Sequence, residues 1–370
     1  MTKTSMKRRT LLKGAVAGTL GLMAGSRLLD AHASTGMTIG VVYVGPRDDF
    51  GWNNSHANGV QALKSLPGVR VLQEERVPET KAVISTMESM IHTDGANLIL
   101  GTSYGYFNPF MVDLAKKYPK VEFRHPTTLW DKDKHPSNLG GYFCYIDQAH
   151  YVDGVAAGLS TKSNKLGYIA AKPIPLVLRT INAFLLGARK VNPNATVTVV
   201  FTGEWSLPVR EAEATNALID AGCDVIACHV DSPKVVVATA ESRKVKSCGH
   251  NVSHASIAPN GFVTGAELKY ETIYKSYAEN LKKGEKLPNM LTGGYDKDMV
   301  QNSPFGAGAS EAARNAALAA IADMKAQKPM FAGPLKDNKG NLVIEKSIGN
   351  YDPSLDGMNY LLEGVVGSVI

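Results

Sequence analysis

From Met37 onward the sequence alternates short apolar runs with longer stretches of helical periodicity, and this alternation limits the possible folds more than any other feature. Strands are predicted at about 37–44, 69–72, 97–100, 121–123, 139–143, 166–170, 196–200 and 224–227. Helices are predicted between them, at about 56–66, 79–93, 108–117, 149–159, 176–190 and 209–221. Repeated β–α units form parallel sheets with helices on both faces. We therefore expect an α/β protein with two doubly wound parallel-sheet lobes, since 370 residues suffice for about two domains.

The net charge of +6 is concentrated at the N-terminus. Residues 1–33 contain six basic residues and one acidic residue, which leaves 34 basic and 33 acidic residues in the remaining chain. A nearly neutral body has no electrostatic basis for binding a polyanion. The sequence therefore predicts no nucleic-acid partner.

Residues 1–33 have the features of an export signal. The pair Arg8-Arg9 is followed by a mildly apolar run at 14–25 and by the small-residue site Ala31-His32-Ala33. This order is typical of a twin-arginine signal peptide, with cleavage expected after Ala33. An anchoring helix is disfavoured because charged residues interrupt the run before the roughly 20 residues that a membrane span needs. No cysteine lies near the cleavage site, so we expect a periplasmic protein and not a lipoprotein.

The usual enzymatic motifs are absent from the sequence. It has no GxSxG, no GxxxxGK[ST], no HExxH, and no GxGxxG between a strand and a helix. His250 and His254 have the spacing of a metal pair on a helix, but their neighbours favour a loop. We therefore expect no enzyme activity, no cofactor and no metal. The four cysteines are expected to be small buried residues, namely Cys144, Cys223, Cys228 and Cys248.

Aromatic and amide residues gather in the loops that follow predicted strands. Trp52 and Asn53 follow the first strand, Tyr104 follows the third, and Trp205 follows the strand that ends at Val200. Ligands of doubly wound sheets bind at the carboxyl ends of the strands. Because aromatic faces stack on flat rings and amides bond to ring edges, these loops favour a pocket for a planar heterocycle.

These loops also carry a resemblance to a known family. Over about residues 37–370 the chain resembles the BMP (basic membrane protein) family of ABC-transporter substrate-binding proteins, in its purine-receptor-like branch. The matching stretches, taken in order and spacing, are 51–56, 153–159, 167–175, 179–188, 222–226 and 362–367.

The resemblance implies a type I periplasmic binding protein fold, in which a three-strand hinge joins the two lobes. The lobes are expected at 37–147 plus 255–285 and at 148–254 plus 286–370. Trp52 takes the stacking role from the first lobe, and Trp205 closes over the ligand from the second. Ring-edge hydrogen bonds are expected from Asn53 and His56, with Arg179 and Asn182 at the cleft edge. The expected ligand-binding set is completed by Tyr104, His125, Asn251, Ser253 and Tyr270.

The sequence departs from the family pattern at one position. Ser253 stands where the family pattern Gly-x-x-x-Asp has an acid, which in nucleoside-binding members holds ribose hydroxyls. Its replacement favours a free base such as adenine over a nucleoside.

The resemblance implies a monomeric receptor that delivers a purine-like ligand to an ABC permease in the inner membrane. Three alternatives remain at this point. The first is a receptor of the same fold for an amide, amino acid or sugar. The second is an exported nucleoside hydrolase, with Asp48, Asp49 or His125 as acid or base. The third is a sensor subunit that signals to a membrane protein.

Overall fold

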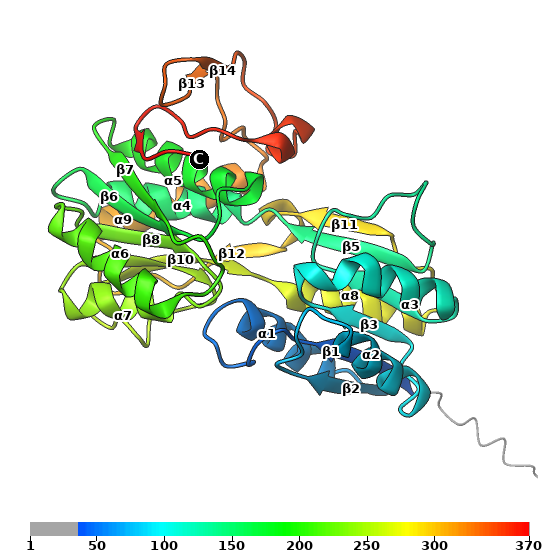
Figure 1. Ribbon diagram of the computed structural model, residues 1–370. Coiled ribbons are helices and arrows are strands. Elements are labelled where there is room, and N and C mark those ends of the chain that lie inside the picture. The colour runs from blue at the N-terminus through cyan, green and yellow to red at the C-terminus, as the bar shows by residue number, and fades with distance from the viewer. Residues whose placement is uncertain (1–35, 370) are drawn as a thin grey trace, which may run out of the picture. The chain divides into compact units, whose positions relative to one another are not determined.

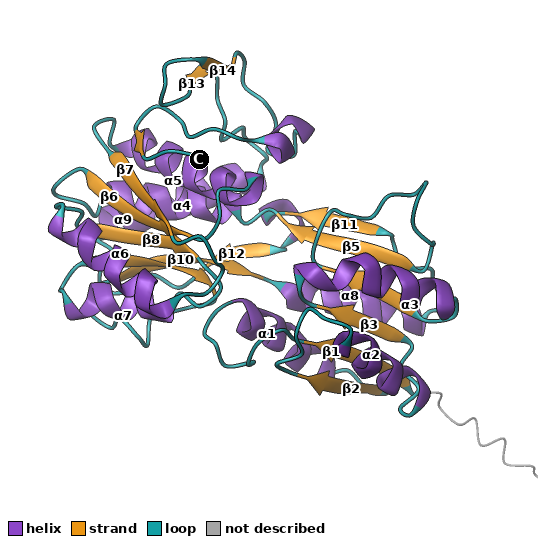
Figure 2. Cartoon of the chain, viewed as in Figure 1, coloured by secondary structure: helices purple, strands orange, loops and turns teal. Residues whose placement is uncertain are grey.

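The computed structural model describes residues 36–369, which belong to one compact unit (Figure 1). The predicted signal peptide at 1–33 lies outside the described residues. Two sheets organise this unit, each with helices on both faces (Figure 2). The expected fold class, two doubly wound parallel-sheet lobes, is confirmed. No described helix combines the length and apolarity that crossing a bilayer would require.

The first sheet has six strands in the order β11-β5-β4-β3-β1-β2, and every neighbouring pair is parallel. Its strands are β1 (Met37–Val42), β2 (Val69–Glu74), β3 (Leu98–Gly101), β4 (Glu122–His125), β5 (Leu139–Cys144) and β11 (Met290–Gly293). One face is covered by α1 (Trp52–Lys64) and α8 (Tyr270–Lys282), and the other by α2 (Ala82–His92) and α3 (Val112–Lys117). Short turns at η1 (Tyr104–Tyr106) and η2 (Phe107–Met111) connect β3 to α3.

The second sheet has seven strands in the order β12-β10-β9-β8-β6-β7-β15, and only the edge strand β12 is antiparallel. Its strands are β6 (Lys165–Ala170), β7 (Thr196–Phe201), β8 (Val225–His229), β9 (Lys246–Asn251), β10 (Phe262–Leu268), β12 (Val300–Asn302) and β15 (Val365–Val366). One face carries α4 (Asp147–Gly158), α5 (Pro175–Val191) and α9 (Glu311–Lys325), and the other carries α6 (Pro208–Asp220) and α7 (Lys234–Ser242).

The chain passes between the two sheets three times, after β5, after β10 and between β11 and β12. The sheet assignment of two strands differs from the expected lobe boundaries. β10 was expected in the first lobe and lies in the second sheet, whereas β11 was expected in the second lobe and pairs with β5 of the first sheet. Pairing partners are chosen by the tertiary fold, so the local sequence of β10 or β11 does not record which sheet the strand joins.

After α9 the chain forms a C-terminal segment with little regular structure. It contains β13 (Leu335–Lys336), β14 (Leu342–Ile344) and the short turn η4 (Pro353–Gly357) before β15. β15 adds a parallel edge strand beside β7. The segment, orange to red in Figure 1, therefore completes the second sheet.

Helix α1 begins at Trp52, four residues before the predicted start at His56. The carboxylate of Asp49 accepts hydrogen bonds from the backbone N–H groups of Gly51, Asn53 and Asn54. These are donors that the first turn of a helix leaves without a helical partner. Asp49 therefore fixes the start of α1 and holds Trp52 in its first turn.

Helices α4 and α5 pack with their backbones in contact, and every residue of α4 is buried. A Cβ atom added at Gly154 of α4 would lie 2.0 Å from the carbonyl oxygen of Phe184. One added at Gly187 of α5 would lie 1.9 Å from the carbonyl oxygen of Tyr151. Only glycine allows this approach, because the atoms opposite are backbone and cannot turn aside.

We predict that Gly187→Ala lowers the free energy of unfolding by about 1–3 kcal/mol or more, because the new methyl group forces the two helices apart. Chemical denaturation of the mature protein measures the change. Gly349→Ala is the matched control, since a Cβ there has no neighbour within 4 Å. Equal stability of both variants would contradict the inferred backbone contact.

Candidate functional site

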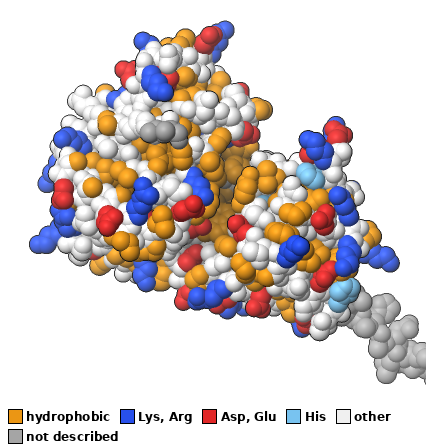
Figure 3. Space-filling model, viewed as in Figure 1, with side chains coloured by type: hydrophobic (Ala, Val, Ile, Leu, Met, Phe, Trp, Pro, Cys, Tyr) orange, Lys and Arg blue, Asp and Glu red, His pale blue; other side chains and the backbone are white. Residues whose placement is uncertain are grey.

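A cavity of about 500 Å³ lies between the two sheets, within the range of small-molecule sites. Its walls come mainly from loops at the carboxyl ends of strands in both sheets, the position expected for doubly wound sheets. Hydrophobic side chains line the hollow that is visible in Figure 3. Of the expected site residues, the structure brings six to this cavity: Trp52, Tyr104, Arg179, Trp205, Asn251 and Tyr270.

The wall from the first sheet is an aromatic cluster built on α1 and α8. The indole Nε1 of Trp52 donates a 2.7 Å hydrogen bond to the carbonyl oxygen of Thr102, which fixes the ring. Tyr270 meets the Trp52 ring edge to face, with centroids 6.0 Å apart. Behind it, the buried ring of His56 stacks on Tyr270 at 3.9 Å and hydrogen-bonds to Tyr274 through Nδ1. His56 therefore supports the wall and does not reach the cavity.

Two more of the expected residues lie outside the cavity lining. The side-chain amide of Asn53 is bonded to the carboxylate of Asp49 and to the backbone N–H of Gly45. His125 at the end of β4 is buried, with its ring nitrogens bonded to the Thr127 hydroxyl and the Ser103 carbonyl oxygen. Burial lowers the pKa of His125 to about 4, despite opposing backbone hydrogen bonds, so the ring is neutral at pH 7.

The wall from the second sheet is formed where β7, β8 and β9 end. Trp205 lies in the loop after β7, His229 ends β8, and His250 and Asn251 end β9. Ser253 follows β9 but is exposed and is not part of the cavity lining. The strand β9 thus contains residues that the sequence assigned to a loop.

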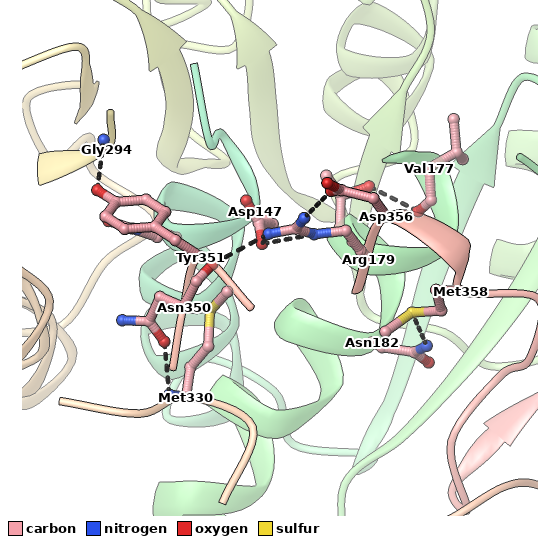
Figure 4. Close-up of polar contacts among 12 residues, drawn as sticks. Asp147, Val177, Arg179, Asn182, Gly294, Met330, Asn350, Tyr351, Asp356 and Met358 are labelled. Carbon is pink, nitrogen blue, oxygen red and sulfur yellow. Dashed lines mark hydrogen bonds and ion pairs between the residues drawn. The ribbon is translucent and has the colours of Figure 1, made fainter. Parts of the chain in front are cut away.

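Arg179 on α5 reaches the cavity edge, but its guanidinium is occupied by protein groups (Figure 4). It donates 2.7 Å and 3.1 Å hydrogen bonds to the buried carboxylate of Asp147 and a 2.9 Å hydrogen bond to Asp356 of η4. Asn182, one turn along α5, is not in the cavity lining. Its amide donates to the carbonyl oxygen of Tyr360 and accepts from the backbone N–H of Leu362. Both side chains attach the C-terminal segment to α5.

Loops from the two sheets touch directly beside the cavity. The backbone N–H of Trp52 donates a 2.9 Å hydrogen bond to the carbonyl oxygen of Asp231. The hydroxyl of Ser232 donates to the carbonyl oxygen of Asp49 at 2.9 Å. A Cβ atom at Gly51 would lie 1.8 Å from the Asp231 oxygen, so this approach requires glycine. The two sheets therefore meet backbone to backbone at this point.

Sequence reasoning missed the acidic residues of the cavity, Glu79, Asp231 and Asp356. Glu79 is engaged by the Ser103 hydroxyl and the Gly105 N–H. The carboxylate of Asp231 has no hydrogen-bond or ion-pair partner among the described residues. Burial, reinforced by nearby carboxylates such as Asp49, raises the pKa of Asp231 to about 8, so the group is largely protonated at pH 7.

Sequence reasoning also missed a cluster of three buried histidines beneath the cavity: His150, His229 and His250. They come from α4, β8 and β9, and their separation in the sequence hides their proximity. The sequence held one signal for this cluster. His229 and His250 lie at the carboxyl ends of two strands, where ligands of such sheets bind. The four cysteines are buried and unpaired, as the sequence suggested.

The fold and the site together define a class of protein. Two doubly wound sheets, three crossings and an aromatic cavity between the sheets are the architecture of type I solute-binding proteins. Residues 37–311 match the model of the Bmp family, described as ABC transporter substrate-binding proteins that are PnrA-like. The chain belongs to this family.

Relatives agree with this assignment. A purine-binding protein of Brucella abortus is 30% identical over 352 residues, 95% of this chain and 98% of the relative. A Haloferax volcanii protein named for ABC transport and glucose binding is 32% identical over 321 residues, 85% of this chain and 79% of the relative. An ABC transporter solute-binding protein from Conexibacter woesei superposes with a TM-score of 0.67 at 20% identity, covering 78% of this chain and 96% of that chain.

We predict that Arg179→Met lowers the free energy of unfolding by about 3–5 kcal/mol, because the carboxylate of Asp147 is left buried without its cation. Urea denaturation measures the loss. The control is Lys190→Met, whose half-exposed ion pair with Asp323 contributes less than about 1 kcal/mol. A loss of stability no greater in Arg179→Met than in this control would rule out the structural role of Arg179.

We also predict that the free energy of unfolding differs between the unaltered protein and Asp231→Asn by an amount that depends on pH. Between about pH 4 and pH 8 the folded protein retains the Asp231 proton that the unfolded chain has released. The unfolding free energy of the unaltered protein therefore falls relative to the variant as pH rises, by at most about 1.4 kcal/mol per pH unit. The difference becomes constant above pH 8. Denaturation curves at pH 5, 6, 7 and 9 test this, and a difference independent of pH would contradict it.

Proposed function

We propose that the protein is the periplasmic receptor of an ABC importer and that it binds a purine base or nucleoside between its two sheets. The observation that carries the proposal is the cavity itself, with Trp52 and Tyr270 on one wall and Trp205 on the other. Flat aromatic surfaces on both sides suit a planar heterocycle. The purine-binding name of the Brucella abortus relative, which matches almost the whole chain, supports the same ligand class.

Closure of the two lobes would complete the site. Contacts such as the one between Trp52 and Asp231 join loops of different sheets, while three crossings leave the sheets able to move about a hinge. A ligand that touches both walls binds the closed arrangement more tightly and so stabilises it. The closed receptor would then dock onto its permease. The twin-arginine route, cleavage after Ala33 and the monomeric state are parts of this proposal.

A sugar ligand is the second candidate, because the Haloferax volcanii relative is named for glucose binding. Sugar hydroxyls need many free polar partners. In this cavity, however, Glu79 is bonded to Ser103, and Arg179 is bonded to Asp147 and Asp356. The few polar groups left for a ligand favour a heterocycle over a polyol.

We infer that the protein is not an enzyme, because two of the three residues nominated for the nucleoside hydrolase alternative are engaged by protein groups. Asp49 is committed to the start of α1, and both ring nitrogens of His125 are bonded to protein groups. Neither group is free to transfer a proton to a ligand in the cavity. Incubation with nucleosides followed by chromatography should return the nucleosides unchanged.

A thermal-shift screen followed by calorimetry tests the proposed function. The mature protein, residues 34–370, is screened against purine bases, nucleosides, pyrimidines, amino acids, amides and sugars. We expect a purine to raise the melting temperature, because it binds only the folded state. A response confined to sugars would transfer the assignment to the second candidate.

Loss of one aromatic wall should weaken binding. We predict that Trp205→Ala reduces purine affinity about 10-fold to 100-fold, since about 1.5–3 kcal/mol of apolar burial is removed. Trp130→Ala is the matched control, because Trp130 lies outside the cavity lining and packs against the core beside α2 and α3. Full affinity in Trp205→Ala, with circular dichroism showing an intact fold, would remove the two-sided clamp from the proposal.

A further inference from the structure

Three histidine rings pack together beneath the cavity, and they come from three different elements. His150 lies on α4, His229 ends β8, and His250 lies near the end of β9. The ring centroids of His229 and His250 are 4.2 Å apart, and those of His150 and His250 are 5.0 Å apart. His229 and His250 line the cavity, whereas His150 lies behind them.

A chain of hydrogen bonds fixes the proton positions, and it starts at a backbone carbonyl group. The Thr180 hydroxyl lies 2.8 Å from the carbonyl oxygen of Val177, which can only accept, and we assign its single proton to that bond. Its oxygen can therefore only accept from its other neighbours, Tyr168 Oη at 3.1 Å and His229 Nδ1 at 2.9 Å. With this assignment, His229 carries its proton on Nδ1. Its Nε2 is then an unprotonated acceptor in the neutral ring.

The same logic extends to the other two rings. Because Tyr168 has given its proton to Thr180, its hydroxyl oxygen accepts from His150 Nδ1 at 3.2 Å. The Nε2 atom of His150 is therefore an acceptor, and His250 Nδ1 donates to it at 2.9 Å. This leaves Nε2 of His250 unprotonated as well. One anchoring carbonyl group thus sets the tautomers of all three histidines.

This chain of hydrogen bonds requires an unprotonated Nε2 on His150, and burial favours the neutral form of all three rings. Burial lowers the pKa of His229 to about 3. Burial, reinforced by the neighbouring histidines, also holds the pKa values of His150 and His250 well below their ordinary range. The nearest acid, Asp153, has an oxygen 3.9 Å from His150 Nδ1, and burial keeps its own pKa well above the usual range. Protonated rings are therefore disfavoured.

Within residues 36–369, the Nε2 atoms of His229 and His250 have no hydrogen-bond partner. Neither atom is among the fully buried side-chain atoms that lack one. Since both residues line the cavity, both acceptor nitrogens are open to its contents. A ligand that fills the cavity must offer them donors, or two buried acceptors lose their hydration without compensation.

We propose that Nε2 of His229 and Nε2 of His250 are paired hydrogen-bond acceptors that select ligands with N–H donors on the edge facing the second sheet. This inference rests on the proposed purine function and narrows it to a free base. For one of the two acceptors we assign as donor the single N–H of the five-membered ring, at the atom that carries the sugar in a nucleoside. A nucleoside or an N-methylated base has no donor there and leaves an acceptor unpaired.

A shared metal ion is the other use of three clustered imidazoles, since their ligand nitrogens lie within 4.8 Å of one another. The present arrangement favours the acceptor pair. His150 and His250 spend one nitrogen each on their mutual hydrogen bond, and the rings of His150 and His229 are parallel, at 1°, instead of converging on a point.

The experiment is a cycle of ligand and protein changes, measured by calorimetry. Adenine, 7-methyladenine and 9-methyladenine are titrated into the unaltered protein, His229→Phe, His250→Phe and the control His92→Phe, whose histidine is exposed on α2 and remote from the cavity. In the unaltered protein and the control, at least one methylated base should bind about 10-fold to 100-fold more weakly than adenine. At least one cavity variant should bring this ratio close to 1, because the acceptor that meets the ring N–H is then absent.

If the histidines had only a structural role, replacing them would weaken the binding of all three ligands alike and leave the ratio unchanged. That result would overturn the acceptor pair but not the proposed function. Failure of the unaltered protein to bind any purine would overturn the proposed function together with this inference. Zinc binding is measured by elemental analysis after dialysis against zinc. Stoichiometric Zn²⁺ in the unaltered protein that is lost in both cavity variants would overturn the acceptor pair and indicate a metal site instead.

Discussion

The backbone contact between α4 and α5 is the constraint on which the rest of the structure depends. Helix α4 follows directly from β5, so it receives the chain at its first passage from one sheet to the other. Its buried side chains then organise the second lobe: Asp147 holds Arg179, His150 holds His250, and Asp153 accepts from Asn302. Arg179 lies on α5, and Gly154 and Gly187 let α5 approach α4 closely enough for the pair with Asp147. The cavity floor and the C-terminal segment are therefore both attached to this helix pair, through His150 of α4 and Arg179 of α5.

The polar groups of the cavity are divided between those that hold the protein together and those left for a ligand. Arg179 and Glu79 belong to the first kind, since Arg179 is paired with Asp147 and Glu79 accepts hydrogen bonds from Ser103 and Gly105. Asp231, His229 and His250 belong to the second, and burial favours the neutral form of each. Neutral polar groups between aromatic walls suit an uncharged ligand, because none of these three groups needs a counter-ion from it.

The α/β alternation is visible in the sequence, and it predicts that ligands bind at the carboxyl edge of each sheet. Trp52, Tyr104 and Trp205 could be placed at that edge because strand ends are visible as breaks in apolar runs. Roles set by contacts across long sequence distances were not predictable. His56 lies behind Tyr270, over 200 residues away in the chain, and nothing local distinguishes support from ligand contact. The exchange of β10 and β11 between sheets has the same origin, since pairing partners are chosen by the tertiary fold.

The burial of all four cysteines has a practical consequence. Cys144, Cys223, Cys228 and Cys248 are enclosed and unpaired, and burial raises the pKa of each thiol, which suppresses the reactive thiolate. A cysteine introduced on the surface would thus be the single site for a thiol-reactive dye. Position 104 is suited to this, because its tyrosine is 64% exposed yet borders the cavity. A dye attached there would border the cavity, so the proposed entry of a ligand would change the surroundings of the dye and could be followed by fluorescence.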